Sequence, residues 1–319
     1  MTVVEADRAP SPVATRLGGR FRLDERINVG EHISGTCGAS AEAGGLSLWK
    51  ATDELLGRPV TIYLLPAGRP VSPDLVAAVL AAAKVSDPRL ATIYDTDFSA
   101  DRPYIVSEWA TGTSLEDLVR SGLPSPALAA AMIADAADAL AVAHRAGRPH
   151  LCLSPHSLRW DVASGLKITG LGIDAALSGT HAANPAAADT VALGRMLYAL
   201  LTGCWPGDEA TALPDAPRHK GHVYTPRQVR AGVPGVLDTI TRHALQLQPG
   251  APSAALLTPA WLATALRSVL RPSYSSFDPA EPAGWTTVRA QQTGPRRQAR
   301  HARSRAGVRH RTTLLDPAA

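Results

Sequence analysis

Cysteine, lysine and aromatic residues are scarce in this chain of 319 residues. Its three widely separated cysteines exclude a scaffold built on several disulfides and leave no Cys-x-x-Cys pair for metal or redox chemistry, so we expect a reducing compartment. Phe, Trp and Tyr make up 5% of the residues, so the hydrophobic core must consist mainly of Ala, Leu and Val. Lysine occurs only four times, against 28 arginines. The length suits one large domain, or two lobes with tails.

The positive charge is concentrated at one end of the chain. The net charge is +4, and residues 289–311 contain eight arginines and no acidic residue. The remaining chain is therefore mildly acidic, which argues against a globular nucleic-acid-binding domain. For the Arg-rich tail three hypotheses stay open: a solvated disordered tail, contact with anionic lipid or nucleic acid, and truncation of a longer protein.

No hydrophobic run predicts a signal peptide or a membrane span. The first 16 residues contain early acids and prolines and have no apolar stretch. The most apolar region, residues 127–144, is interrupted by Asp135 and Asp138 and predicts a buried amphipathic helix. We therefore expect no transmembrane segment and a cytoplasmic location, with a peripheral position at the inner membrane surface as the alternative.

The order of the predicted elements divides the chain into two lobes. Residues 1–20 predict a disordered segment, and residues 21–110 contain five strand-like runs and one helix. Residues 111–271 predict mostly helices, and residues 272–319 predict a disordered tail. The prediction is an α+β protein with a small, five-stranded antiparallel lobe containing one helix and a larger, mostly helical lobe.

Four strings occur in a fixed order along these lobes: YIVSEWATGTSLEDLV, ALAVAHRAGRPHLCLSPHSLRWD, LKITGLGI and DTVALGRMLYALLTGCWP. In this order they resemble the hinge, the catalytic loop with the helix before it, the metal-binding turn and the central large-lobe helix of bacterial Ser/Thr protein kinases. The resemblance extends over about residues 21–271 and implies the two-lobed protein kinase-like fold. Fold alone does not establish activity, so each site position needs its own examination.

In the small lobe, the residues with which this family holds ATP are missing. The phosphate loop should read GxGxxG, whereas the glycines after Gly30 are irregularly spaced. The family's strand lysine falls at Tyr63, whose phenol carries no positive charge, and the helix glutamate falls near Ala78. Lys50, on the preceding strand, is either a replacement for that lysine or a solvent-facing residue, and we favour the second hypothesis.

In the large lobe, the residues that handle substrate and metal are also replaced. Counted from His150, Cys152 stands at the catalytic base, Ser154 at the lysine and Ser157 at the asparagine. Gly170 takes the place of the metal-binding aspartate, and hydroxyl and thiol groups are poor ligands for Mg²⁺. We therefore expect no magnesium site, no required cofactor and weak or absent ATP binding.

Any residual nucleotide contact would involve the hinge. Glu108, Trp109 and Ala110 have backbone groups that could meet an adenine, and Lys50 is the nearby lysine. Cys152 suggests a thiol nucleophile between two histidines, but a small buried packing residue is the hypothesis we favour. No spacing of histidines predicts a metal site.

Positions that serve packing and backbone geometry in the family are retained. They are His150, Pro155, Leu171, Gly172, Asp189 and Gly194. By the resemblance, His150 and Leu171 stack in the hydrophobic spine and Asp189 braces the catalytic loop. The segment from 173 to 188 is short, rich in Ala and lacks the Ala-Pro-Glu anchor, so no peptide-substrate platform is expected.

The resemblance therefore implies a pseudokinase, similar to the module associated with MviN-type lipid II flippases in actinobacteria. That resemblance implies a regulatory role in cell-wall synthesis, phosphorylation by a Ser/Thr kinase and binding to a forkhead-associated domain. Two alternatives stay open: an atypical Ser/Thr kinase with residual ATP binding, and a binder of anionic lipid or nucleic acid through the tail.

Overall fold

A computed structural model describes residues 16–28, 45–247 and 257–270, and the structural statements below concern these residues. The chain divides into two compact units, residues 1–277 and 278–319. The second unit and the Arg-rich tail lie outside the described residues, so the predictions made for the tail stay predictions.

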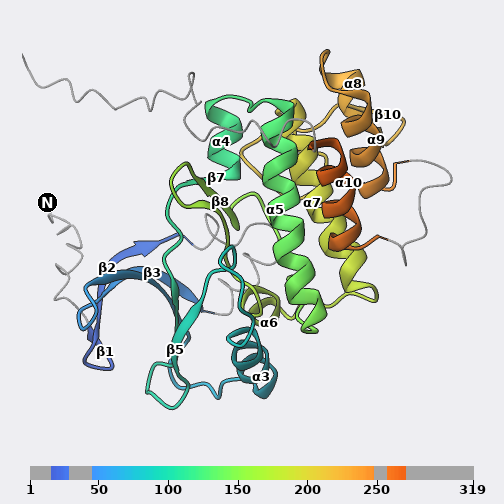
Figure 1. The fold of residues 1–319 in the computed structure, drawn as a ribbon. Coiled ribbons are helices and arrows are strands. Elements are labelled where there is room, and N and C mark those ends of the chain that lie inside the picture. The colour runs from blue at the N-terminus through green and yellow to red at the C-terminus, as the bar shows by residue number, and fades with distance from the viewer. Residues whose placement is uncertain (1–15, 29–44, 248–256, 271–319) are drawn as a thin grey trace, which may run out of the picture. The chain divides into compact units, whose positions relative to one another are not determined.

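The small lobe is built on a six-stranded antiparallel sheet (Figure 1). Its spatial order is β1 (Arg16–Leu17), β2 (Phe21–Ile27), β3 (Ser47–Asp53), β4 (Arg58–Leu64), β6 (Tyr104–Glu108) and β5 (Ile93–Asp97). The five predicted strands are confirmed. The sheet has one more strand than predicted, β1, and residues 16–20 belong to this β1–β2 region and are not disordered. The added strand β1 pairs with β2 across a turn in which Gly18 and Gly19 have φ of 54° and 66°, a conformation that glycine adopts at little cost.

Alternation along the strands gives the sheet two apolar faces. One face packs against α3 (Pro73–Ala82), which begins where the Ser72 hydroxyl accepts a hydrogen bond from the Asp74 N–H. The core on this face comprises Leu46, Leu48, Tyr63, Leu65, Leu75, Val79, Ile105 and Ile173. Leu48 and Lys50 are two residues apart in β3, so their side chains lie on the same face of the sheet. Leu48 pairs with Tyr63 of this core, and Lys50 pairs with Thr61. Lys50 therefore lies on the face that packs against α3.

The large lobe is mainly helical and follows the small lobe in the chain (Figure 1). Its helices are α4 (Leu115–Ser121), α5 (Pro126–Arg145), α6 (Asp174–Ser178), α7 (Pro185–Thr202), α8 (Pro226–Val229), α9 (Gly235–Ala244) and α10 (Pro259–Leu270). Short strands form two further small sheets, β7 (Thr113–Ser114) with β8 (Leu158–Asp161) and β9 (Gly165–Ile168), and β10 (Arg218–His219) with β11 (His222–Val223). The predicted α+β, two-lobed architecture is confirmed.

Helix α5 lies in the core of the large lobe, as the sequence predicts. Ser125 caps its start by accepting a hydrogen bond from the Leu128 N–H, and Pro126 opens its first turn. In the part of the chain that the structure describes, α5 is the one helix long and apolar enough to cross a membrane. Of its most apolar window, 61% is buried inside the protein, so its hydropathy is explained by the core.

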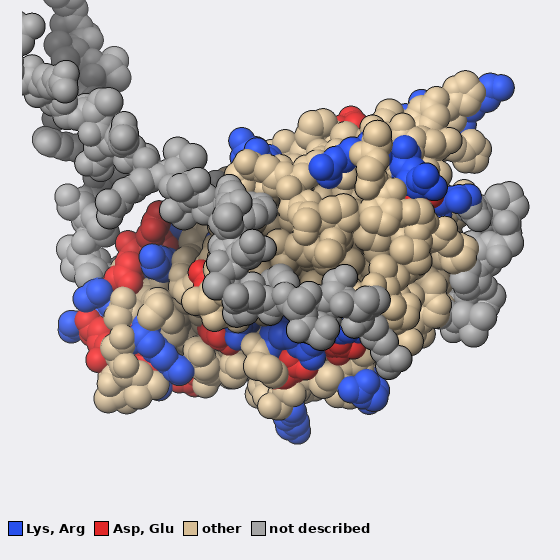
Figure 2. Space-filling view, turned by 45° about the horizontal axis from the view of Figure 1, so that its top comes forward, with Lys and Arg blue, Asp and Glu red and all other residues tan. Residues whose placement is uncertain are grey.

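Charged side chains of both signs are interspersed at the small-lobe end of the face shown in Figure 2. Ion pairs of this lobe include Arg16–Glu54 and Arg22–Asp24, with N–O distances of 3.0 and 2.8 Å. Exposed pairs of this kind contribute little to stability. The fold is therefore held mainly by the apolar cores, and the candidate site must be sought where the lobes meet.

Candidate functional site

Tyr63 occupies the strand position at which the family resemblance places a lysine. It lies in β4 between its register partners Leu48 and Ile105, and its side chain is 1% exposed. Burial raises the pKa of Tyr63 well above its ordinary value, and the nearby Asp174 carboxyl group adds to the rise when it ionises. Tyr63 therefore fills the interior beneath the sheet with a neutral side chain and supplies no cation.

Lys50 lies on the face of β3 that also carries Leu48. It is half-buried, and its Nζ lies 5.1 Å from the centre of the Trp109 ring. An ammonium at this distance is attracted by the electron-rich face of the indole. Lys50 is thus directed at the hinge.

The hinge is fixed by a lysine that the sequence did not single out. Lys167 on β9 places its Nζ 2.7 Å from Glu108 Oε1 and 2.7 Å from the carbonyl oxygen of Pro88. Glu108 Oε2 accepts a hydrogen bond from the Thr92 N–H at 3.1 Å, and the Glu108 N–H donates to the Thr92 carbonyl at 2.8 Å. These contacts join β5, β6 and β9 beside Trp109 and the buried Ala110.

Asp189 on α7 organises the loop that resembles the catalytic loop. Its side chain is 1% exposed and accepts hydrogen bonds from the backbone N–H groups of His150 and Leu151, at 2.8 and 2.7 Å. His144 Nε2 lies 2.7 Å from the same carboxylate. Leu151 has φ of 63°, an uncommon conformation for leucine that these bonds hold in place.

His150 is a buried residue of the interior. Its Nε2 lies 2.7 Å from the carbonyl oxygen of Thr169, and burial lowers its pKa. Leu171, two residues beyond Thr169, belongs to the main core of the large lobe. These positions therefore join the catalytic-loop segment to the segment that resembles the metal-binding turn.

The serine hydroxyls of this loop are engaged in its own turn. Ser157 Oγ accepts from the Ser154 N–H at 2.9 Å and donates to the Ser154 carbonyl at 2.8 Å. Pro155 contributes its carbonyl oxygen, which accepts from the Leu115 N–H at the start of α4. Ser154 and Ser157 are both buried, and these bonds hold the backbone of the turn.

Cys152 is buried as well, at 5% exposure. Its sulfur lies 3.4 Å from the Ser178 hydroxyl oxygen. Reactive thiolates are partly exposed and lie beside a positive charge, whereas a buried cysteine behaves as a packing residue. The thiol-nucleophile hypothesis therefore has no support from this geometry.

The space beside Gly170 is filled by Asp174, a residue that the sequence analysis missed. Gly170 has φ of 86°, and a Cβ added there would lie 1.8 Å from Asp174 Oδ2. Asp174 opens α6 and is 1% exposed, and its Oδ1 has no hydrogen-bond partner among the described residues. Burial raises the pKa of Asp174 well above its ordinary value, so its carboxyl group is neutral over a wider pH range. One feature of the sequence could have identified it: Asp174 is the one acidic residue between Asp161 and Asp189.

Helix α3 approaches this segment closely. A Cβ added at Gly172, which has φ of 73°, would lie 2.4 Å from the Cβ of Ala82 and 3.1 Å from the carbonyl oxygen of Ala78. Ala78 is the position at which a glutamate would be expected. Helix α3 therefore packs so closely on the Gly172 backbone that position 172 has no room for a side chain.

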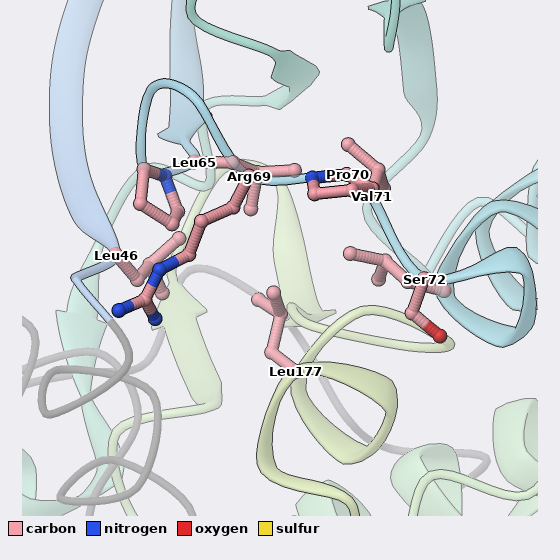
Figure 3. A pocket seen from close by; sticks show the side chains of 9 residues that line it. Leu46, Leu65, Arg69, Pro70, Val71, Ser72 and Leu177 are labelled. Carbon is pink, nitrogen blue, oxygen red and sulfur yellow. The ribbon is translucent and has the colours of Figure 1, made fainter.

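Within the described residues, no group of three or more His, Cys, Asp and Glu side chains is placed to hold a metal ion. A pocket of about 170 Å³ adjoins the site between the start of β3, the β4–α3 loop and α6 (Figure 3). Its labelled lining is mostly apolar, with Leu177 rising from α6 and the Arg69 guanidinium beside Leu46. With one charged side chain in its lining, this pocket has no set of groups for a metal-bound triphosphate.

Comparison with known proteins gives matches to bacterial protein kinases. No protein-family model matches the chain. A probable serine/threonine-protein kinase of Corynebacterium efficiens is 31% identical over 229 residues, which is 59% of this chain and 34% of that protein. PrkC of Bacillus subtilis is 26% identical over 251 residues (69% and 39%), and PknB of Mycobacterium tuberculosis is 28% identical over 261 residues (71% and 40%). The chain thus spans about a third to two-fifths of the length of these relatives.

Among solved structures, the kinase domain of Mycobacterium tuberculosis PknI matches with a TM-score of 0.56 at 14% identity. The match covers 81% of this chain and 99% of that domain. The fold is that of a two-lobed protein kinase-like domain. In sequence the chain is similar to bacterial Ser/Thr protein kinases.

Proposed function

We propose that the chain is a catalytically inactive, kinase-like module with a regulatory or scaffolding role. The observation that carries this proposal is the surroundings of the two positions that resemble the family's phosphate-binding lysine and metal-binding aspartate. There Tyr63 and Asp174 are both buried, and Asp174 fills the space beside Gly170. Phosphoryl transfer needs cations and metal ions placed against the triphosphate, and a buried phenol and a buried neutral carboxyl group supply neither.

The contrast between two groups of residues supports the proposal. Asp189 and His150 make the buried hydrogen bonds that hold the loop in shape. Ser154 and Ser157, at positions where the family binds substrate and metal, bond to each other's backbone instead. The framework is retained while the groups that would touch phosphate are occupied elsewhere.

Addition of ATP with Mg²⁺ or Mn²⁺ is expected to raise the melting temperature of the full chain by less than about 1 °C. A ligand present at a hundred times its Kd would stabilise the protein by about 2.7 kcal/mol, or roughly 5–10 °C for a domain of this size. Thermal-shift titrations with and without metal measure the effect. A metal-dependent rise of several degrees would contradict the proposal, whereas a small metal-independent rise would indicate adenine contact at the hinge alone.

An atypical Ser/Thr kinase is the second candidate, because the curated relatives are named kinases and Lys50 lies on the face of the sheet that packs against α3. We expect no transfer of radiolabelled phosphate from ATP by the full chain, with either metal ion. If transfer is seen, Lys50→Ala should abolish it under the second candidate. Lys84→Ala, at an exposed lysine after α3, is the matched control. Transfer that survives Lys84→Ala but not Lys50→Ala would overturn the proposal of an inactive module.

A regulatory module requires partners, and here the proposal extends the resemblance noted in the sequence. We include a role in cell-wall synthesis signalling, phosphorylation by a Ser/Thr kinase, and recognition of the phosphorylated chain by a forkhead-associated domain. The large lobe offers helical surface for protein contacts. Binding of anionic lipid or nucleic acid is assigned to the tail alone.

A further inference from the structure

We propose that Asp174 and α6 form a pH-dependent switch, in which the neutral carboxyl group keeps α6 closed against the small-lobe core and its ionisation opens α6. The inference concerns the conformation of α6 and holds whether or not the chain transfers phosphate. It shares the neutral carboxyl group of Asp174 with the proposed function, but the movement of α6 is its own. If α6 does not open while Asp174 stays neutral, the proposed function is unchanged.

Helix α6 packs against the core of the small lobe. Ile173, immediately before the helix, is 1% exposed and belongs to the small-lobe core with Val79 of α3. Ala176 and Leu177 pack against the same core. Since α6 spans only Asp174–Ser178, this packing must hold it in place, because so short a helix is unstable by itself.

The carboxyl group of Asp174 lies at the centre of this contact. The backbone N–H groups of Ile173 and Asp174 both donate to the Gly170 carbonyl at 3.0 Å, which turns the Asp174 side chain back over Gly170. Its Oδ1 is buried without a hydrogen-bond partner among the described residues. A neutral carboxyl group tolerates such a place far better than a carboxylate does.

Among the residues that the structure describes, no charged group in this contact compensates an ionised Asp174. Tyr63 of β4 interacts with it electrostatically and is itself neutral. The acid of α3, Asp74, is exposed in the first turn of that helix. From the catalytic loop, Cys152 is uncharged beside α6, and His150 is directed at Thr169 with a lowered pKa. Ionisation of Asp174 must therefore be stabilised by water, which requires α6 to move.

The sign of the pH dependence follows from the raised pKa of Asp174. The closed state is most stable below the ordinary aspartate pKa of 3.8, where the carboxyl group is neutral whether α6 is closed or open. As the pH rises from there to the pKa of the closed state, the open state ionises first and gains population. Above the pKa of the closed state the population of the open state levels off. Opening also moves Leu177, a wall of the pocket in Figure 3.

Hydrogen–deuterium exchange of the full chain between pH 5 and pH 8.5 tests the proposal. In peptides that cover α6, exchange divided by the intrinsic chemical rate should rise about tenfold per pH unit until it levels off. Asp174→Asn, which keeps the shape without the charge, should abolish this rise and leave α6 closed throughout. Asp101→Asn, at an exposed loop residue, should keep it, and peptides of α5 should show no rise.

An equal pH dependence of α6 in wild type and Asp174→Asn would overturn the proposal. So would faster exchange of α6 in Asp174→Asn at every pH, because it would mean that the carboxylate form holds the helix. If Asp174→Asn does not fold, carbon-13 NMR of the aspartate carboxyl groups in the wild-type chain decides. One carboxyl group must titrate well above 3.8, and titration of all of them in the ordinary range would overturn the proposal.

Discussion

Alanine in place of Asp189 is expected to lower the free energy of unfolding by about 3–5 kcal/mol. The buried carboxylate accepts hydrogen bonds from the His150 and Leu151 N–H groups and lies 2.7 Å from His144 Nε2. Without it, two N–H groups lose their acceptor, and Leu151 loses the contact that holds its φ of 63°. Urea unfolding at pH 7 measures the loss.

Two further variants separate the contributions at Asp189. Asp101→Ala, at an exposed position, should change the free energy of unfolding by less than about 0.5 kcal/mol. His144→Ala removes one partner and leaves both backbone bonds, so its effect should be clearly smaller than that of Asp189→Ala. A loss below about 1 kcal/mol for Asp189→Ala would show that the loop holds its shape without this residue.

Restoring the family's aspartate at position 170 is expected to destabilise the protein and to create no magnesium site. Gly170→Asp would place a Cβ 1.8 Å from Asp174 Oδ2 and force a φ of 86° on a residue with a side chain. The left-handed conformation alone costs about 1–2 kcal/mol, and overpacking of a buried site adds about 1–3 kcal/mol. We expect a loss of roughly 3 kcal/mol by urea unfolding, and no shift of the melting temperature with Mg²⁺.

The double variant Gly170→Asp/Asp174→Ala tests the steric cause. Removing the Asp174 carboxyl group frees the space beside position 170, so the double variant should recover part of the stability lost in Gly170→Asp. The strain of the backbone would remain. If Gly170→Asp is as stable as wild type and gains a magnesium-dependent shift, the filled-site explanation is wrong.

Local patterns predicted the elements of the fold well. The Ser72–Pro73 pair predicted the start of α3, and residues 127–144 predicted the buried helix α5. Strand β1 was missed because two residues are too short to show an alternating pattern. The site positions Tyr63 and Gly170 could be located from the resemblance, since their order and spacing survive in the chain.

Long-range contacts could not be read from the sequence. The approach of Lys50 to Trp109 depends on strand register, and that of Lys167 to Glu108 depends on how β9 meets the end of β6. Asp174 was missed because the segment around it is short and rich in Ala, with no periodicity that predicts α6. Its importance is visible only when Gly170 and α3 are seen beside it.

The sequence by itself determined which chemical groups this protein has at each family position: a phenol at Tyr63, no side chain at Gly170, hydroxyls at Ser154 and Ser157. Tertiary structure alone decided what those groups do. It buried Tyr63 and Asp174 together, and it directed the serine hydroxyls to the backbone. The physical reason is that charge state and hydrogen bonding depend on burial and on neighbours, which are set by segments far apart in the chain.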